Sequence, residues 1–141
     1  MTAIIGLDHG TRRIGVAVAE TETGLAFARP AIRRSSLEAD LGTIRGLAVD
    51  ESAQIIVIGL PLNMDGTEGS QARAVRVFGD RLVAIGMTVA YQDERLSSWE
   101  AGERLADAGE RPSRRSGEID SAAARLILQQ YLDAHPPEET E

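Results

Sequence analysis

The sequence contains no cysteine and no lysine, and only two of its 141 residues are histidines. The missing cysteines exclude a disulfide framework and thiolate metal ligands, and two histidines are too few for a zinc site built on imidazoles. A bound metal ion would therefore be held by oxygen atoms. All 15 basic residues are arginines, whose planar guanidinium groups suit phosphate, and no lysine is available for proton transfer.

Long apolar runs are also missing. None approaches the roughly 20 residues needed to span a bilayer, and no charged-then-apolar leader opens the sequence. We therefore expect a cytoplasmic protein with no membrane partner. With 43% hydrophobic residues, we expect residues 1–135 to form one domain, followed by a disordered acidic tail at 136–141. The net charge of −7 argues against a nucleic-acid partner, but part of it lies in this tail.

Hydrophobic periodicity predicts an α/β fold. We expect strands at 4–8, 14–19, 25–32, 55–59 and 87–91, and helices at 35–47, 70–86, 97–108 and 118–134. The first three strands form an antiparallel meander, and the continuous aliphatic run at 55–59 is typical of a parallel strand covered on both faces. This order predicts a mixed five-stranded sheet with helices packed on it and strand 4–8 in the centre.

The ends of the helices carry their own signals. Ser35 and Glu38 form a capping box at the start of the first helix. In the last helix one apolar arc is predicted to face the sheet, and it comprises Ile119, Ala123, Leu126, Ile127 and Tyr131.

Acidic residues stand where these elements end or begin. Asp8 ends the central strand, Asp93 and Glu94 follow the fifth strand, and Asp120 lies in the first turn of the last helix. Asp8 could hold a hard cation or could merely accept hydrogen bonds from turn amides. Convergent carboxylates cannot all stay ionised without a partner, so a divalent cation, Mg²⁺ or Mn²⁺, is expected. Two such ions would suit hydrolysis of a phosphodiester.

Two loops are candidate ligand contacts. Residues 59–69 follow a buried strand, where ligands bind in such sheets. Residues 109–117 contain Arg111, Arg114 and Arg115, which predict a phosphate or nucleic-acid contact, with a solvated loop as the alternative.

Four stretches are similar, in order and spacing, to the motifs of the YqgF/RuvX family: GLDHGTRRIGVAVAE, IIVIGLPLNMDGTEGSQA, YQDERLSSWEA and EIDSAAARLILQQYLD. Together they reach from end to end of the chain. The resemblance implies an RNase H-like fold related to RuvC Holliday-junction resolvases. It also implies a nuclease that processes the 5′ end of pre-16S rRNA in ribosome biogenesis.

The same resemblance implies roles for single residues. Asp8, Glu94 and Asp120 would be the catalytic, metal-binding carboxylates, with Asp93 as an alternative ligand that has a shorter reach than Glu94. Phosphates would meet Arg12, Arg13 and Arg95, and residues 59–69 would border the cleft. Arg12 stands where the family often has lysine, a departure that keeps the positive charge.

Rival interpretations start from the same residues. The segment Asp-His-Gly-Thr also resembles the phosphate-binding hairpin of actin-like ATPases and sugar kinases, but those proteins need a second domain. A Holliday-junction resolvase-like DNA nuclease would act as a symmetric dimer, and a non-catalytic nucleic-acid or ribosome-binding module would need no cleavage. The sequence does not distinguish an RNA substrate from a DNA substrate, or endonucleolytic from exonucleolytic cleavage. We expect the protein to act on structured RNA, with the pre-ribosome as a candidate partner, and to be a monomer or a weak homodimer.

Overall fold

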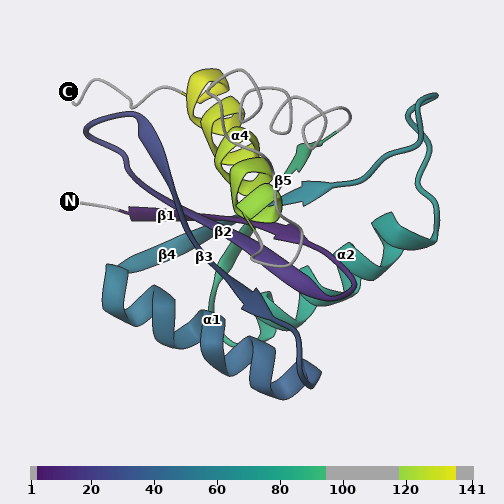
Figure 1. The fold of residues 1–141 in the computed structure, drawn as a ribbon, viewed down its shortest axis with the longest axis horizontal. Coiled ribbons are helices and arrows are strands. Elements are labelled where there is room, and N and C mark those ends of the chain that lie inside the picture. Colours follow the sequence, from purple (N-terminus) through teal and green to yellow (C-terminus); the bar gives the residue numbers. More distant parts are fainter. Residues whose placement is uncertain (1–2, 95–117, 136–141) are drawn as a thin grey trace.

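The computed structural model describes residues 3–94 and 118–135, and its centre is one five-stranded sheet (Figure 1). In spatial order the strands are β3 (Leu25–Arg33), β2 (Arg13–Glu20), β1 (Ala3–His9), β4 (Ala53–Leu60) and β5 (Thr88–Asp93). The pairs β3–β2 and β2–β1 are antiparallel, whereas β1–β4 and β4–β5 are parallel. The predicted mixed sheet, a meander followed by parallel strands with β1 in the centre, is confirmed.

Helices cover both faces of this sheet. Helices α1 (Leu37–Glu51) and α2 (Ser70–Ala84) lie on one face, and α4 (Glu118–Ala134) crosses the other (Figure 1). Alternation along β1 separates the two cores, because Ile5 and Leu7 pack toward α1 and α2 whereas Ile4 packs toward α4. In the described part of the chain, no helix is long and apolar enough to cross a membrane.

Glycines let α4 lie close to the sheet. A Cβ atom at Gly6 would come within 2.7 Å of Leu128 Cβ, and one at Gly15 would collide with the backbone of Asp120. The first turn of α4 is also tied to β2, since the backbone N–H of Val16 donates to the hydroxyl of Ser121 at 3.3 Å. Gly15, which has no side chain, therefore allows Asp120 to lie directly over β2.

The face that α4 buries is wider than the predicted arc. Ala123, Leu126 and Ile127 are buried as expected, but Ile119 and Tyr131 are only partly buried. Further buried positions are Ser121, Ala124, Leu128 and Leu132. The small residues on the facing strands allow this closer and broader contact.

The predicted cap of α1 is wrong by one residue. Ser36, not Ser35, is the N-cap, and its hydroxyl accepts a hydrogen bond of 3.1 Å from the N–H of Ala39. The N–H of Ser35 donates instead to Asp40 at 3.0 Å. Because Asp40 is buried, its carboxylate needs donors, and it takes Ser35 as one of them.

Some predictions lie outside the described residues. These are the helix at 97–108, the loop at 109–117, the tail at 136–141, and the side chains of Arg95, Arg111, Arg114 and Arg115.

Candidate functional site

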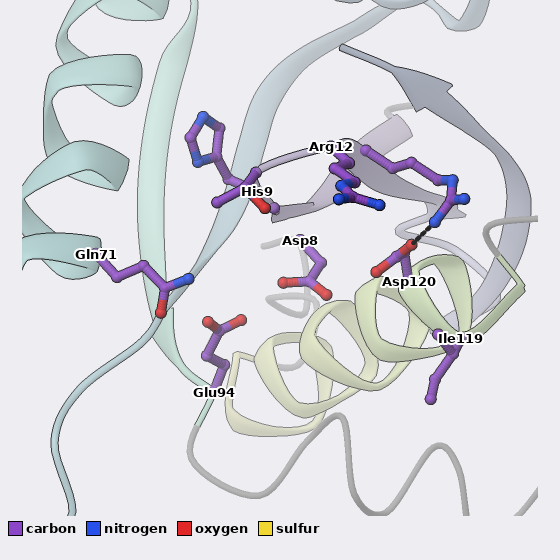
Figure 2. Close-up of a pocket in the computed structure, with 10 residues that line it drawn as sticks. Asp8, His9, Arg12, Gln71, Glu94, Ile119 and Asp120 are labelled. Carbon is purple, nitrogen blue, oxygen red and sulfur yellow. Dashed lines mark ion pairs between the residues drawn. The ribbon is translucent and has the colours of Figure 1, made fainter. Parts of the chain in front are cut away.

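A cavity of about 540 Å³ opens at the carboxyl end of the central strands (Figure 2). Three elements supply its acids: Asp8 comes from β1, Glu94 directly follows β5, and Asp120 comes from α4. The remaining lining residues are His9, Gly10, Thr11, Arg12, Arg13, Gln71 and Ile119. The cavity therefore brings together the three carboxylates that the sequence predicts, along with two of the predicted arginines.

Asp8 and Glu94 form the closest pair in this cavity. Their carboxyl groups point toward each other (Figure 2) and are hydrogen-bonded. Glu94 continues the sheet beyond β5, because its N–H donates to the carbonyl of Leu60 at 3.2 Å. A Cβ at Gly59 would collide with the Glu94 carboxylate, so the glycine leaves room for this side chain. The Asp8–Glu94 contact thus joins β1 to the end of β5 across Gly59 of β4.

Burial disfavours the state in which both carboxyl groups of this pair are ionised. The pKa of Asp8 is raised to about 6, chiefly by burial. The hydrogen bond with Glu94 lowers this pKa, and the charge of Asp120 raises it. Burial and the nearby charge of Asp8 raise the pKa of Glu94 to about 8. Near neutral pH the two carboxyls therefore share one proton, as close carboxyl pairs do. A cation could take the place of that proton.

Asp120 is held differently. Its Oδ2 lies 3.7 Å from Nη1 of Arg13 (Figure 2), because the first turn of α4 packs on the strand that carries Arg13. Among residues 3–94 and 118–135, no group of three acidic, histidine or cysteine side chains is placed to hold one metal ion. Of the three predicted carboxylates, those of Asp8 and Glu94 are in direct contact. The carboxylate of Asp120 lines the same cavity but lies beside Arg13.

The structure distinguishes the two acids at the end of β5. Asp93 pairs with Leu60 in the ladder between β4 and β5 and does not line the cavity, whereas Glu94 does. Successive side chains of an extended chain point to opposite faces. No residue of the predicted bordering segment 59–69 lines the cavity. Gly59, in β4, lies against the Glu94 side chain, and the lining residue nearest to this segment is Gln71 in the first turn of α2.

Sequence reasoning did not assign His9, Thr11, Gln71 or Ile119 to the site, although all four line the cavity. Gln71 extends from α2 toward Glu94 (Figure 2). His9 packs against Phe78, with ring centroids 4.7 Å apart, and its Nε2 has no hydrogen-bond partner among the described residues. Burial lowers the pKa of His9 to about 4, and the positive charge of Arg34 adds to this, so the ring is neutral at pH 7. The position of His9 next to Asp8 at the end of the strand could have indicated that it lies near the site. No feature of the sequence indicated this for Gln71.

A buried ion pair anchors the turn that follows Asp8. Asp40, whose side chain is 2% exposed, accepts from Nε of Arg34 at 3.4 Å, and Nη1 of Arg34 donates to the carbonyl of Gly10 at 3.0 Å. The backbone N–H of Arg34 also donates to the carbonyl of Arg12 at 2.9 Å. Side chains from the end of β3 and from α1 thus hold the β1–β2 turn. No local motif connects these distant residues, so the sequence did not predict this contact.

The sequence is similar to known proteins over almost its whole length. The chain matches the family model described as "RuvX: Holliday junction resolvase" over residues 2–134. A relative from Myxococcus xanthus (strain DK1622), named "Putative pre-16S rRNA nuclease", is 45% identical over 138 residues, which cover 97% of this chain and 91% of the relative. A relative of the same name from Synechococcus sp. is 43% identical over 132 residues, covering 93% and 89%.

Solved structures share the fold at low sequence identity. RuvC of T. thermophilus in complex with a Holliday junction substrate matches with a TM-score of 0.54 and 13% identity, covering 96% of this chain and 98% of that one. The large terminase nuclease of thermophilic phage G20c matches with a TM-score of 0.56 and 13% identity, covering 92% and 81%. The predicted RNase H-like fold is confirmed, and the family model and the two relatives establish that this chain belongs to the RuvX family.

Proposed function

We propose that this protein is a divalent-metal-dependent nuclease that hydrolyses phosphodiester bonds in structured RNA, with the 5′ end of pre-16S rRNA as its substrate. The observation that carries the proposal is the hydrogen-bonded pair of Asp8 and Glu94 in a cavity that arginines also line. The relatives' name supplies the RNA substrate. On this account the protein is a cytoplasmic monomer that acts on the pre-ribosome.

The carboxyl pair fits a hard divalent cation. Mg²⁺ and Mn²⁺ prefer oxygen ligands, and Asp8 and Glu94 provide carboxyl oxygens whose mutual repulsion a cation would relieve. Asp120 is the third acid of the same cavity. When bound, such an ion supplies Lewis acidity toward the phosphoryl oxygens and makes water a better nucleophile.

The chain's own groups then position the substrate. Arg12 and Arg13 line the cavity beside the acids, where their guanidinium groups can donate paired hydrogen bonds to phosphate oxygens. Contacts of this kind fix the position of a nucleic-acid backbone without reading its bases. The substrate would therefore be recognised through the shape of a folded RNA, and the exposed amide of Gln71 would add a contact from the α2 side.

Cleavage of three labelled substrates tests this proposal: a precursor of 16S rRNA, a single-stranded RNA and a DNA four-way junction. Each is incubated with wild-type protein in Mg²⁺, Mn²⁺ or EDTA, and with Asp8→Asn. Asp50→Asn is the matched control, because Asp50 is exposed on α1, away from the cavity. We expect metal-dependent cleavage of the rRNA precursor that Asp8→Asn loses and Asp50→Asn keeps. Folded wild-type protein that cleaves none of the substrates would overturn the proposal and favour a binding module.

A second candidate is a DNA nuclease that resolves four-way junctions. The description of the matching family model favours it. Because cutting both strands of a junction symmetrically requires two active sites, this function needs a dimer. Preferred cleavage of the junction, together with a dimeric mass in solution, would select this candidate over the RNA nuclease.

A further inference from the structure

A second cavity, of about 1010 Å³, lies beside the first. It is lined by the β1–β2 turn and by the end of β3 with the residues that follow it, and it contains the side chains of Arg12, Arg13, Arg33 and Arg34. Thr11, Arg12 and Arg13 line both cavities. The site with the acids and the site with the arginines therefore meet at the turn that follows Asp8. We call the second one the arginine pocket.

The four arginines differ in their partners. Arg34 is tied to Asp40 and to the carbonyl of Gly10, and Arg13 is close to Asp120. Within residues 3–94 and 118–135, no acidic side chain forms an ion pair with Arg12 or Arg33, and both are exposed. Although the whole chain has a net charge of −7, this pocket thus carries excess positive charge.

The β2–β3 register adds an electrostatic argument. Arg13 and Arg33 are direct partners across this antiparallel pair, so their side chains leave the same face of the sheet. Two like charges at opposed positions repel each other. Asp120 already lies beside Arg13, so an anion beside Arg33 would relieve the rest of that repulsion, which makes Arg33 a suitable contact for phosphate.

The pocket also continues the line of the candidate active site across the sheet. Asp8 on β1, Arg13 on β2 and Arg33 on β3 lie on neighbouring strands of the α4 face. Asp8 is opposite Gly15, whereas Arg33 is opposite Arg13, two residues away along β2. With strands about 4.8 Å apart and a rise of about 3.4 Å per residue, the Arg33 backbone lies roughly 12 Å from that of Asp8. A polyanionic chain that has one phosphate at Asp8 would reach Arg33 with a phosphate further along.

We propose that the arginine pocket binds the phosphodiester backbone of the substrate next to the bond that is cleaved, and that Arg33 is its specific contact residue. Arg12 joins the pocket to the acids, and Arg34 holds the turn in place through Asp40 and Gly10. The proposal rests on the proposed nuclease function for one point, that the bound backbone continues to the bond that is cleaved. Its binding step needs only a phosphodiester chain.

Binding measured in EDTA tests the pocket without any cleavage. The affinity of wild type, Arg33→Ala and Arg45→Ala for labelled rRNA precursor and for a DNA four-way junction is followed between about 50 and 200 mM salt. Arg45 is an exposed arginine on α1 that lines neither cavity, so its variant removes the same charge elsewhere. Thermal unfolding of all three proteins checks that they are folded.

We expect Arg33→Ala to raise Kd roughly threefold to tenfold and to lower the slope of log Kd against log salt by about 1, the effect of one lost phosphate contact. Arg45→Ala should follow wild type. The substrate that shows the larger change identifies the backbone the pocket serves. Equal affinity and slope for Arg33→Ala and Arg45→Ala would overturn the pocket even if the nuclease reaction exists. Slope loss in a protein that never cleaves would retain the pocket and reject the nuclease. Wild-type protein that binds neither substrate in EDTA would overturn the pocket, and cleavage in Mn²⁺ would still decide on the nuclease.

Discussion

Two partly or fully buried aspartates lie near the β1–β2 turn in opposite surroundings. Asp40 accepts hydrogen bonds from the guanidinium of Arg34 and from the N–H of Ser35. Asp8 instead shares its hydrogen bond with another carboxyl, that of Glu94, and burial raises the pKa of both. An acid with cationic and amide partners stabilises the fold. An acid that faces an acid weakens the fold at neutral pH and creates a site for a cation, which is typical of functional positions.

The largest effect should come from removing one acid of the pair. Glu94→Gln keeps the shape of the side chain but removes a charge that would hold the cation. We expect cleavage to fall on the order of 1000-fold, the scale seen when one group that stabilises transition-state charge is lost. Initial rates at saturating Mn²⁺ measure it, with Asp50→Asn as control. A fall of less than about tenfold would contradict a shared role of Asp8 and Glu94.

Breaking the other acid's contacts should instead lower stability. Asp40→Ala leaves the Arg34 guanidinium and the Ser35 N–H without their acceptor, and we expect the free energy of unfolding to fall by about 3 kcal/mol. Glu51→Ala is the comparison, because it breaks the ion pair of 3.2 Å with the largely exposed Arg29. That change should cost less than about 1 kcal/mol. Urea unfolding measures both, and equal losses would show that burial of Asp40 contributes nothing.

The same contrast predicts how stability depends on pH. Glu94 has a pKa of about 8 in the folded chain, against 4.5 as its ordinary value, so the folded state binds more protons between these two values. Stability is therefore lost as the pH rises toward and through 8. His9, whose pKa is lowered to about 4, has the opposite effect, since its contribution is lost as the pH falls from 6.5 through 4. The window above pH 6.5 thus reports the carboxyl pair.

Between pH 6.5 and 9 we expect the wild-type free energy of unfolding, without divalent ions, to fall by about 2 kcal/mol. In Glu94→Gln the decline should nearly vanish, because a glutamine has no proton to lose. Chemical unfolding at several pH values in EDTA gives this curve. A wild-type curve that stays flat would mean that the fold does not raise the pKa of Glu94, which would contradict the account of the buried carboxyl pair.

The sheet, and the acids that stand at the ends of its strands, could be predicted from the sequence. Alternating residues and aliphatic runs are patterns of neighbouring residues, which a sequence shows directly. Asp8 was expected on the central strand and lies there. Contacts between distant elements could be predicted only in part. The meeting of Asp8 and Glu94 at one edge of the sheet was expected, although β4 lies between their strands. The contact of Arg34, at the end of β3, with the carbonyl of Gly10 was not.

The wrong details share a physical cause. Ser35 was expected to cap α1, but the buried carboxylate of Asp40 takes its N–H. The buried face of α4 is wider than its own periodicity indicated, because Gly6 and Gly15 on the sheet let the helix approach. In both cases the deciding group belongs to another turn or strand, which a local pattern cannot report.

Calorimetric titration with Mn²⁺ at pH 7, in buffers of different ionisation enthalpy, shows whether Asp8 and Glu94 form a cation site. Metal binding displaces protons from its ligands, and Glu94, with a pKa of about 8, is protonated at this pH. The account predicts saturable binding with release of about one proton in wild type, and loss of both signals in Asp8→Asn. Wild-type protein that binds no Mn²⁺, or that binds it equally well without Asp8, would contradict the account.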